Sequence, residues 1–353
     1  MQIYCSITMR SDNTIKKSLL ISLIAIFLVP AWAAGEVSAN VGGKGHEEGI
    51  SNSQPFPDWL SQFRQEAKQQ GISEKTLNSA LDKMRGPKSR IIKLDRNQPE
   101  VKLTFQEYLN KTVTKARIRK ARKELRRNRK LLDRIAKHYA VQPRFLVALW
   151  GMETDFGRLT GGFNAIEALA TLAYDGRRSD FFRQELLSAL KILDEGHVSA
   201  KRMKGSWAGA MGQMQFMPST FLTHAVDFTR DGKKDVWTTL PDSLASGANY
   251  LSTIGWDKSQ TWGREVIIPK MLDDKLIGVE VRKSINEWQK LGVLNTDKSA
   301  LPDADMQAAL IRHEGKRDRY FLVYNNFHML MDWNRSEKYA TAVGILADAL
   351  IGY

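Results

Sequence analysis

The sequence is almost free of cysteine: among its 353 residues the one cysteine is Cys5, which stands ahead of an apolar run near the N-terminus. The chain beyond that run therefore has no disulfide, no thiol and no cysteine that could carry a lipid anchor. Its 6 histidines form no cluster with cysteine at metal-ligand spacing, which excludes a zinc site of that kind. No internal repeat is visible either.

Long apolar runs are also lacking, and the run at residues 19–30 is too short for a comfortable membrane span. Basic residues precede this run and a small-residue motif follows it: Arg10, Lys16 and Lys17, then Ala31-Trp32-Ala33. This order is typical of a secretory signal peptide. We expect residues 1–33 to be removed, with an uncleaved anchor as the alternative. The mature chain would then be a soluble periplasmic protein of a bacterial envelope, without a stable membrane span.

Acidic residues are outnumbered, because 39 Asp and Glu face 53 Lys and Arg and give a formal charge of +14. The predicted signal peptide carries only three basic residues and Asp12, so the mature chain remains strongly basic. A charge of this sign favours polyanionic partners. Because we expect the chain to be exported, its expected polyanionic partners are envelope polymers or anionic lipid surfaces. Nucleic acid is not an expected partner, since only one basic helical stretch favours it.

The length and the 42% apolar content allow roughly two domains. Residues 34–57 contain Gly, Ser and Pro without periodicity and predict a flexible linker. Residues 58–140 predict an N-terminal helical domain, in which Asp58 and Ser73 could cap helices. Within it, residues 103–139 predict an amphipathic helix with a solvated basic face, and a polyanion-binding surface is the alternative. β-branched runs at 266–268 and 279–281 and a short helix near Trp288 predict a small α/β insertion at 263–312.

One carboxylate, Glu153, stands out within residues 141–157, VQPRFLVALWGMETDFG. Pro143 suits the first turn of a helix and Gly157 the position just past its end. Leu149 and Trp150 fall on the same helical side as Glu153, so the acid lies in an apolar stripe. Burial there and the negative end of the helix dipole raise the pKa of a carboxyl group, which suits general-acid chemistry. A solvent-facing Glu153, or one paired with Arg158, is the alternative.

A second informative stretch is SWAGAMGQMQFMPSTF at residues 206–221. Gly209 and Gly212 permit close approach of backbone to backbone or to a ligand. Ser206, Gln213 and Gln215 offer hydroxyl and amide groups that can bond sugars. A tightly packed turn that leads into a helix is the equally weighted alternative.

Residues 227–235, DFTRDGKKD, resemble half of a calcium-binding loop. Five residues match positions 1, 3, 5, 6 and 9 of an EF-hand: Asp227, Thr229, Asp231, Gly232 and Asp235. The twelfth position is Thr238, where a bidentate Glu is required, although Asp242 could substitute in a reshaped loop. The carboxylates Asp227, Asp231 and Asp235 therefore predict a structural Ca²⁺ site, with a polar turn as the alternative.

Four stretches together resemble the lytic murein transglycosylase B family: GMETDFG, SWAGAMGQMQFMPSTF, DSLASGANYLSTIGW and MDWNRSEKYATAVGILAD. The resemblance runs from Trp59 to Ala349 and includes LDRNQPE at residues 94–100. It implies a mainly α (α+β) fold with a lysozyme-like catalytic core at 141–262, completed by 313–353. It also implies that the partners are peptidoglycan glycan strands and proteins of cell-wall synthesis or remodelling, and that the reaction requires no cofactor.

The resemblance implies that Glu153 is the sole catalytic acid and base. It further implies that the glycan groove is lined by Ser206, Gln215, Phe216, Tyr250, Trp333, Asn334 and Tyr339. Trp333 stands where at least some members of the family have tyrosine, so an aromatic face is kept and its hydroxyl is not.

No convincing second acid accompanies Glu153, because Asp155 points to a different helical side. Other nearby acids lie in ordinary helix or turn contexts: Glu167, Asp175 and Asp180. One carboxylate suffices if the attacking hydroxyl belongs to the substrate, whereas most glycosidases use two. We therefore expect a lytic transglycosylase that closes a 1,6-anhydro ring on N-acetylmuramic acid. A hydrolytic muramidase and a non-catalytic peptidoglycan-binding or scaffold protein are the alternatives.

Overall fold

The computed structural model describes residues 54–97 and 103–352. The predicted signal peptide and residues 34–53 of the predicted linker lie outside the described residues. The described chain is mainly helical with a two-stranded and a five-stranded sheet, so the predicted fold class is confirmed. None of its helices combines the length and apolar character of a transmembrane segment.

The first three helices are α1 (Phe56–Gln69), α2 (Glu74–Leu81) and α3 (Ser89–Arg96), and α3 packs against a later helix of the core, α8 (Ala165–Asp175). The Ser73 side chain caps α2 by accepting a bond from the Thr76 N–H at 3.3 Å, as predicted. Asp58 does not cap α1, because Pro55 and Pro57 start that helix earlier and leave Asp58 in its first turn. Helix α1 therefore begins inside the predicted linker.

The basic stretch forms three helices where one was predicted: α4 (Phe105–Thr112), α5 (Lys115–Arg127) and α6 (Arg129–Tyr139). The first break occurs where Thr114 accepts a bond from the Arg117 N–H at 3.1 Å and so starts a new helix. The second occurs at Asn128, whose side chain bonds the Glu124 carbonyl at 3.0 Å. The amphipathic pattern is real, since Ala121, Leu125 and the apolar side of α6 are buried.

The middle of the molecule is built around α7 (Pro143–Thr154), and every residue from Phe145 to Thr154 is buried. Helices α5, α6 and two later helices pack against it: α11 (Leu240–Thr253) and α14 (Glu337–Asp348). The remaining core elements are α8 (Ala165–Asp175), α9 (Ser179–Asp194), α10 (Pro218–His224), β1 (Phe163–Asn164) and β2 (Lys204–Gly205). The strand pair β1–β2 anchors the turn that contains residues 205–216.

A five-stranded antiparallel sheet forms the other end, in the order β4-β6-β7-β3-β5. Its elements are β3 (Gly263–Ile267), β4 (Arg282–Ser284), α12 (Ile285–Lys290), β5 (Leu294–Asn295), β6 (Gln307–His313) and β7 (Arg319–Val323). Strand β7 lies outside the predicted 263–312 insertion, and residues 279–281 precede β4 instead of forming a strand. A β-branched run alone does not make a strand, because a pairing partner is also needed.

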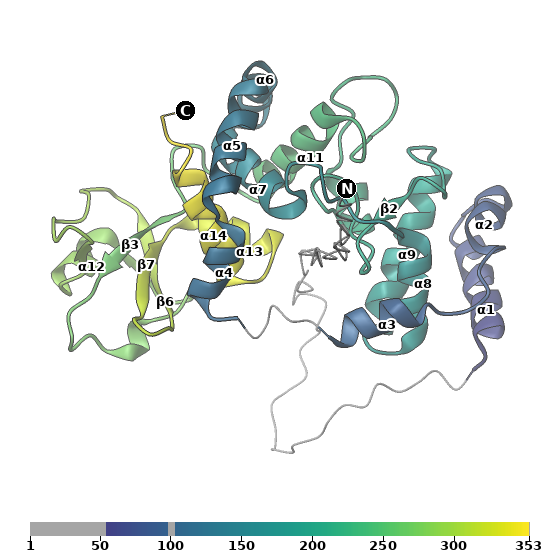
Figure 1. Cartoon of the computed structure of the whole chain (residues 1–353), viewed down its shortest axis with the longest axis horizontal. Coiled ribbons are helices and arrows are strands. Elements are labelled where there is room, and N and C mark those ends of the chain that lie inside the picture. Colours follow the sequence, from purple (N-terminus) through teal and green to yellow (C-terminus); the bar gives the residue numbers. More distant parts are fainter. Residues whose placement is uncertain (1–53, 98–102, 353) are drawn as a thin grey trace, which may run out of the picture.

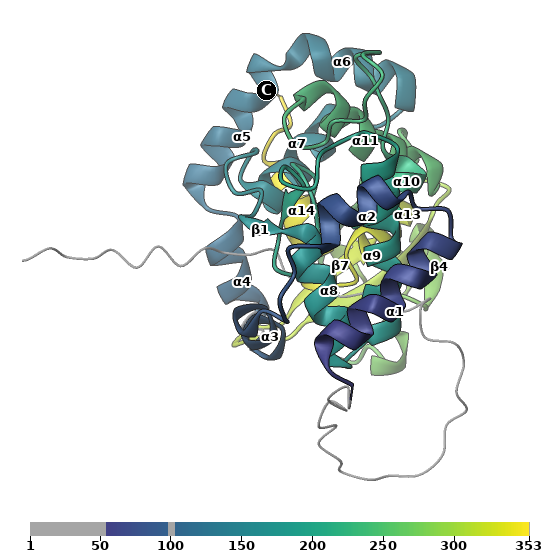
Figure 2. The ribbon, with the colours of Figure 1, turned by 90° about the vertical axis from the view of Figure 1, so that its right-hand side faces the viewer.

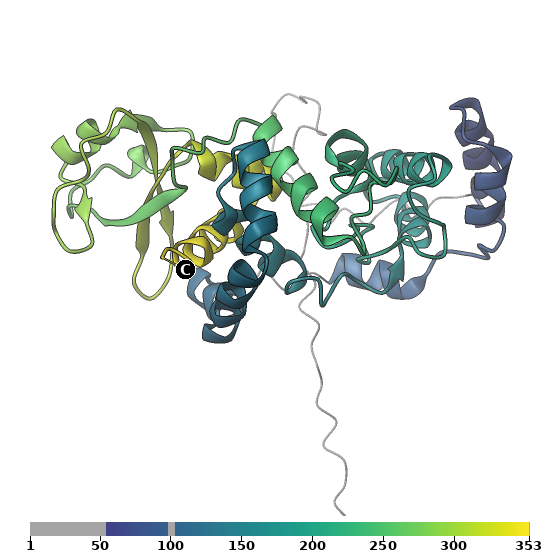
Figure 3. The same ribbon diagram turned by 90° about the horizontal axis from the view of Figure 1, so that it is seen from above.

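Side chains alternate between two cores along β6 and β7, as the two-residue period of a strand requires. Ile311 and Phe321 face the main core, whereas Leu310 and Leu322 face a smaller core around Trp288 of α12. After β7 the chain re-enters the helical centre through α13 (Asn325–Trp333) and then α14. Figures 1 and 3 show the resulting order along the molecule, with the sheet at one end, α7 and α14 in the middle, and α1 and α2 at the other end. Figure 2 looks onto the α1 and α2 end.

Gly344 allows α14 to sit against the buried Trp262, since an added Cβ would overlap the indole ring. We predict that Gly344→Ala lowers the free energy of unfolding by about 1–3 kcal/mol through this overpacking. Denaturant titration measures the loss. Gly86→Ala is the matched control, because a Cβ there would meet nothing within 4 Å. Equal stability of both variants and wild type would refute the packing argument.

Candidate active site

Glu153 lies in the last turn of α7 and is only 4% exposed. The helix ends directly after it, because Asp155, Phe156 and Gly157 follow with φ values of 49°, 61° and 76°. Asp155 and Phe156 hold these left-handed conformations while their N–H groups bond the Gly151 and Trp150 carbonyls. The chain therefore turns sharply away and leaves Glu153 at a buried helix end, where the apolar stripe predicted it.

One oxygen of Glu153 accepts both of its hydrogen bonds. Trp333 Nε1 donates to Oε1 at 2.9 Å, and the Tyr339 hydroxyl donates to the same atom. Oε2 is buried and has no hydrogen-bond partner. The alternative pairing with Arg158 does not occur, since Arg158 bonds Asp155 at 2.6 Å.

Burial raises the pKa of Glu153 from its ordinary value to about 7, and the bonds from Tyr339 and Trp333 partly oppose this rise. A carboxyl group with this pKa can both give and take a proton near neutral pH. The pKa of Tyr339 is raised well above its ordinary value, first by burial and then by the neighbouring charge of Glu153. Tyr339 is therefore a hydrogen-bond donor to Glu153 and stays protonated.

Three predicted groove residues form an aromatic cluster next to Glu153. The Trp333 ring centroid lies 5.5 Å from that of Phe216 and 5.0 Å from that of Tyr250. Burial raises the pKa of Tyr250 to about 12, and its hydroxyl donates to the Asp332 carbonyl at 3.0 Å. His224 contacts Tyr250 at a centroid distance of 4.7 Å. Sequence reasoning missed His224, because nothing in the local pattern marks this residue at the end of α10.

Ser206 and Gln215 stabilise the turn that precedes α10. The Ser206 hydroxyl accepts bonds from the Ala208 and Ala210 N–H groups at 3.2 and 3.1 Å. The Gln215 amide donates to the Gly212 and Thr160 carbonyls at 2.9 and 3.1 Å. Both side chains are buried, so their first role is to shape the turn.

The same turn is tied to α7 through Gln213. Its side-chain oxygen accepts a bond from Trp150 Nε1 at 3.0 Å, and its backbone carbonyl accepts one from the Thr154 hydroxyl at 2.8 Å. These bonds flank Glu153 along the helix and fix the turn against it. Gln213 was predicted as a sugar-bonding amide, whereas its contacts here are with the protein.

Asn334 directly follows Trp333 and is 5% exposed. Its Oδ1 atom is buried without a hydrogen-bond partner, as is Glu153 Oε2. A buried acceptor without a donor costs about 1–3 kcal/mol. A ligand that brings N–H or O–H groups would satisfy both atoms.

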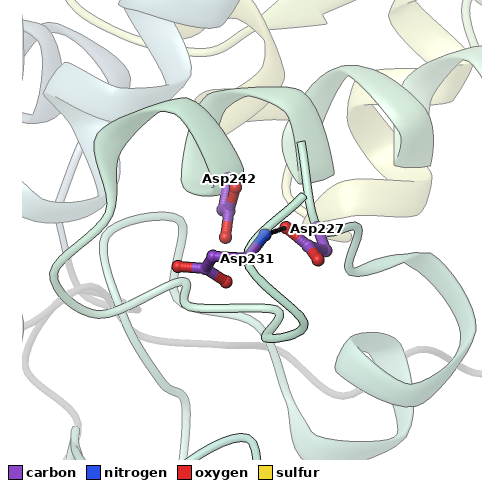
Figure 4. A group of neighbouring side chains, drawn as sticks. All are labelled: Asp227, Asp231 and Asp242. Atoms are coloured by element: carbon purple, nitrogen blue, oxygen red, sulfur yellow. Dashed lines mark hydrogen bonds between the residues drawn. The ribbon is translucent and has the colours of Figure 1, made fainter. Parts of the chain in front are cut away.

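A group of three carboxylates comprises Asp227, Asp231 and Asp242, with one oxygen of each within 4.8 Å of the others (Figure 4). Asp235, predicted as the third ligand, instead accepts bonds from the Trp237 and Thr238 N–H groups at 2.9 Å. Asp242 takes its place from the first turn of α11, as a reshaped loop would allow. The sequence register of an EF-hand therefore fails at its ninth position.

The loop is already shaped around these carboxylates. Asp227 accepts bonds from the Asp231 and Gly232 N–H groups at 3.1 and 2.8 Å. Asp242 is fully buried and accepts bonds from the Phe228 and Thr229 N–H groups at 2.9 and 3.0 Å. Hard oxygen donors of this kind suit Ca²⁺.

A helical core with a buried glutamate of raised pKa beside an aromatic cluster defines a candidate glycan-processing enzyme. The chain belongs to the family described as the transglycosylase SLT domain, which matches residues 55–348. It is 34% identical over 225 residues to the membrane-bound lytic murein transglycosylase B of Escherichia coli K12. That alignment covers 62% of this chain and 60% of the relative.

Solved structures extend the similarity over most of the chain. SltB3 from Pseudomonas aeruginosa, in complex with NAG-anhNAM-pentapeptide, is 42% identical with a TM-score of 0.82, and the match covers 85% of this chain and 80% of that one. SltB1 from the same organism is 30% identical with a TM-score of 0.74, over 83% and 98% of the two chains. The Escherichia coli lytic transglycosylase Slt35 in complex with calcium is 28% identical with a TM-score of 0.72, over 86% and 94%. The resemblance predicted from sequence is thus confirmed.

The raised pKa of Glu153 predicts a pH-dependent stability difference between wild type and Glu153→Gln. Folding favours the neutral acid, so this stabilisation is complete below the unfolded pKa near 4.5 and is lost as the pH rises through about 7. Wild type should therefore lose about 3 kcal/mol relative to the variant between about pH 4 and pH 8. Denaturant unfolding at both pH values measures the difference. An identical difference at the two pH values would contradict the assignment.

Proposed function

We propose that this protein is a lytic transglycosylase of the bacterial envelope. It cleaves the β-1,4 bond between N-acetylmuramic acid and N-acetylglucosamine and leaves 1,6-anhydromuramyl ends. The observation that carries the proposal is the buried carboxyl group of Glu153, which has no basic partner and a pKa raised to about 7, in a chain of the transglycosylase SLT family. The similarity to SltB3, whose bound NAG-anhNAM-pentapeptide contains an anhydro sugar, supports the same reaction.

Glu153 acts twice in this mechanism. As the acid, it protonates the glycosidic oxygen while the bond from that oxygen to C1 of N-acetylmuramic acid breaks. As the base, it takes the proton of the C6 hydroxyl while O6 bonds to C1 and closes the ring. The carboxyl group ends protonated, as it began, and no water is consumed. A pKa near the working pH suits a group that must do both.

Other acids around the site have structural partners, which supports a single-carboxylate mechanism. Asp155 pairs with Lys120 at 3.2 Å and with Arg158 at 2.6 Å. Glu185, the other buried glutamate of the described residues, bonds the Ser219 hydroxyl and N–H at 2.6 and 2.9 Å. Two further acids from the sequence face basic residues: Asp175 faces Arg96, and Glu167 faces Lys88.

The glycan strand would meet the aromatic cluster and the buried acceptors. Phe216, Tyr250 and Trp333 offer apolar ring faces of the kind that pack against sugar rings. Asn334 Oδ1 would accept a bond from an N-acetyl N–H or a hydroxyl of the substrate. Ser206 and Gln215 would act mainly by holding the turn, and Tyr339 by holding Glu153.

The site of action that fits these features is the periplasm. The basic charge of +14 matches an anionic wall polymer, and the N-terminal signal pattern matches export. Peptidoglycan glycan strands are the partner that the proposed reaction requires. Proteins of cell-wall synthesis or remodelling remain predicted partners.

Digestion of purified sacculi tests the reaction. We predict that wild-type products carry anhydro ends and are lighter by one water than muramidase products, as measured by mass spectrometry. Glu153→Gln should lower the rate at least about 100-fold, because it removes the general acid and base. Glu185→Gln is the matched control, since it changes a buried glutamate outside the site and should retain activity. Products that contain the added water would identify a hydrolase, and no cleavage by either form would favour a binding protein.

We also propose that Asp227, Asp231 and Asp242 hold a structural Ca²⁺, which takes no part in the reaction. Three carboxylates brought this close repel one another, and a divalent cation relieves that repulsion. The complex of Slt35 with calcium supports this assignment.

Calcium should therefore stabilise the folded protein. At a hundredfold excess over Kd, Ca²⁺ should add about 3 kcal/mol to the free energy of unfolding relative to EDTA-treated protein. Thermal or denaturant unfolding of Asp231→Asn should show a much smaller calcium effect. Asp273→Asn, which changes another loop aspartate that bonds a nearby backbone N–H, should respond like wild type. A calcium effect that is equal in all three proteins would place the ion elsewhere.

A further inference from the structure

Two hydrogen-bond donors from different helices converge on one oxygen of Glu153 and leave the other oxygen without a partner. Trp333 at the end of α13 and Tyr339 in α14 both donate to Oε1. We infer that Trp333 is a positioning residue for Glu153, which fixes Oε1 as the hydrogen-bond acceptor and leaves Oε2 as the oxygen that exchanges the proton with substrate. This inference rests on the proposed function and adds a role for Trp333 beyond an aromatic face for the sugar.

The two hydrogen bonds that Oε1 accepts determine which oxygen of Glu153 carries the carboxyl proton. A carboxyl oxygen offers two lone pairs in its plane. The Trp333 N–H and the Tyr339 O–H use both of those on Oε1. With the Tyr339 hydroxyl oriented as a donor, the proton of the neutral acid resides on Oε2, which is buried and has no other partner. The same oxygen is then the one that takes the proton of the C6 hydroxyl.

The indole of Trp333 differs from a hydroxyl group in its hydrogen bonding. This difference matters because Glu153 acts first as an acid and then as a base. An indole N–H can only donate, whereas a tyrosine hydroxyl can rotate and also accept. Trp333 therefore bonds Oε1 both when Glu153 is neutral and when it is ionised. Its bond is worth more to the carboxylate, because hydrogen bonds to charged groups are stronger. The indole thereby limits the penalty of the ionised state in the reaction cycle.

Packing holds the indole in place. The ring is inclined by 57° to Phe216 and by 75° to Tyr250, in contact with both. Gly247 of α11 lies beside the far edge of the ring, since a Cβ built there would be in ordinary contact with the Trp333 ring at 3.6 Å. A ring fixed on three sides keeps its N–H directed at Glu153 without further ordering.

Charged groups on the neighbouring elements do not bond Glu153. Arg117 of α5 bonds the Thr112 carbonyl and contacts the Met152 sulfur at 3.8 Å. The remaining titratable groups near the site are Tyr108 of α4, Asp155 with Lys120 and Arg158, Tyr250 of α11, Asp332 of α13 and Glu337 of α14. Among the described residues, the groups that bond Glu153 and shift its pKa are Trp333 and Tyr339. A change in the titration of Glu153 therefore reports on these two donors.

Trp333→Phe tests the inference, because it keeps an aromatic ring and removes the N–H. We expect kcat to fall about tenfold, since a hydrogen bond to a charged group is lost. The pH at which activity declines should move upward, because a donor that lowers the pKa of Glu153 is gone. KM should change less than kcat. Phenylalanine is smaller than tryptophan and could disturb the packing, so a second variant replaces Trp333 by benzothienylalanine, which keeps the shape of the indole but lacks its N–H. This variant should show the same upward displacement of the pH profile.

Trp237→Phe is the matched control. Its indole N–H bonds the Lys204 carbonyl at 2.9 Å, away from Glu153, so its pH profile should match that of wild type. A rise in KM without a displaced pH profile in Trp333→Phe would overturn the inference and leave Trp333 as a sugar-stacking residue.

A readout without turnover separates this inference from the proposed function. Infrared difference spectra, assigned with Glu153→Gln, follow the protonation of the Glu153 carboxyl group in the absence of substrate. Its midpoint should lie at higher pH in Trp333→Phe and in the benzothienylalanine protein than in wild type. An unchanged midpoint would overturn the inference. Hydrolytic products from wild type together with a displaced midpoint would reject the transglycosylase reaction and retain the role of Trp333.

Discussion

The structure depends on the burial of one ionisable carboxyl group at the end of an entirely buried helix. A charge in such a place is costly unless donors meet it. The donors come from residues 180 and 186 positions later in the chain. The fold must therefore bring α13 and α14 back to α7 after the sheet has been built. Gly344, which lets α14 pack against Trp262, is part of the same requirement.

The turn before α10 meets a second requirement: it must lie against α7 without its polar side chains forming hydrogen bonds to Glu153. Its polar side chains bond mostly its own backbone, as Ser206 does with two N–H groups and Gln215 with two carbonyls. Gln213 then ties the turn to Trp150 and Thr154, on the helix that carries Glu153. The amides and hydroxyls that look like sugar ligands in the sequence are thus used first to keep a glycine-containing turn rigid. Asn334, with an unbonded buried oxygen, is the better candidate for a direct sugar contact.

Local features of the sequence predict the local parts of the site. Pro143, Gly157 and the apolar residues between them are enough to place a helix that ends beside a buried Glu153, because helix signals and periodicity act over a few residues. Sequence patterns do not reveal contacts between residues that come together only in the tertiary structure. The exchange of Asp235 for Asp242 depends on where α11 begins relative to the loop. The bond from Trp333 to Glu153 depends on the return of the chain after the sheet, and the resemblance alone suggested only an aromatic face.

The proposed mechanism with a single acid is physically consistent with the surroundings of Glu153. A nearby ionised carboxylate would raise the pKa of Glu153 further, through repulsion at low dielectric, and would make the acid step harder, because Glu153 would give up its proton less readily. Neutral donors on Oε1 have the opposite effect, since they favour the ionised form without adding charge. Burial alone would leave a strong base that gives up its proton reluctantly, whereas burial with Trp333 and Tyr339 gives a pKa of about 7. The indole and the phenol thereby allow one carboxyl group to serve in both steps, provided that the nucleophile comes from the sugar itself.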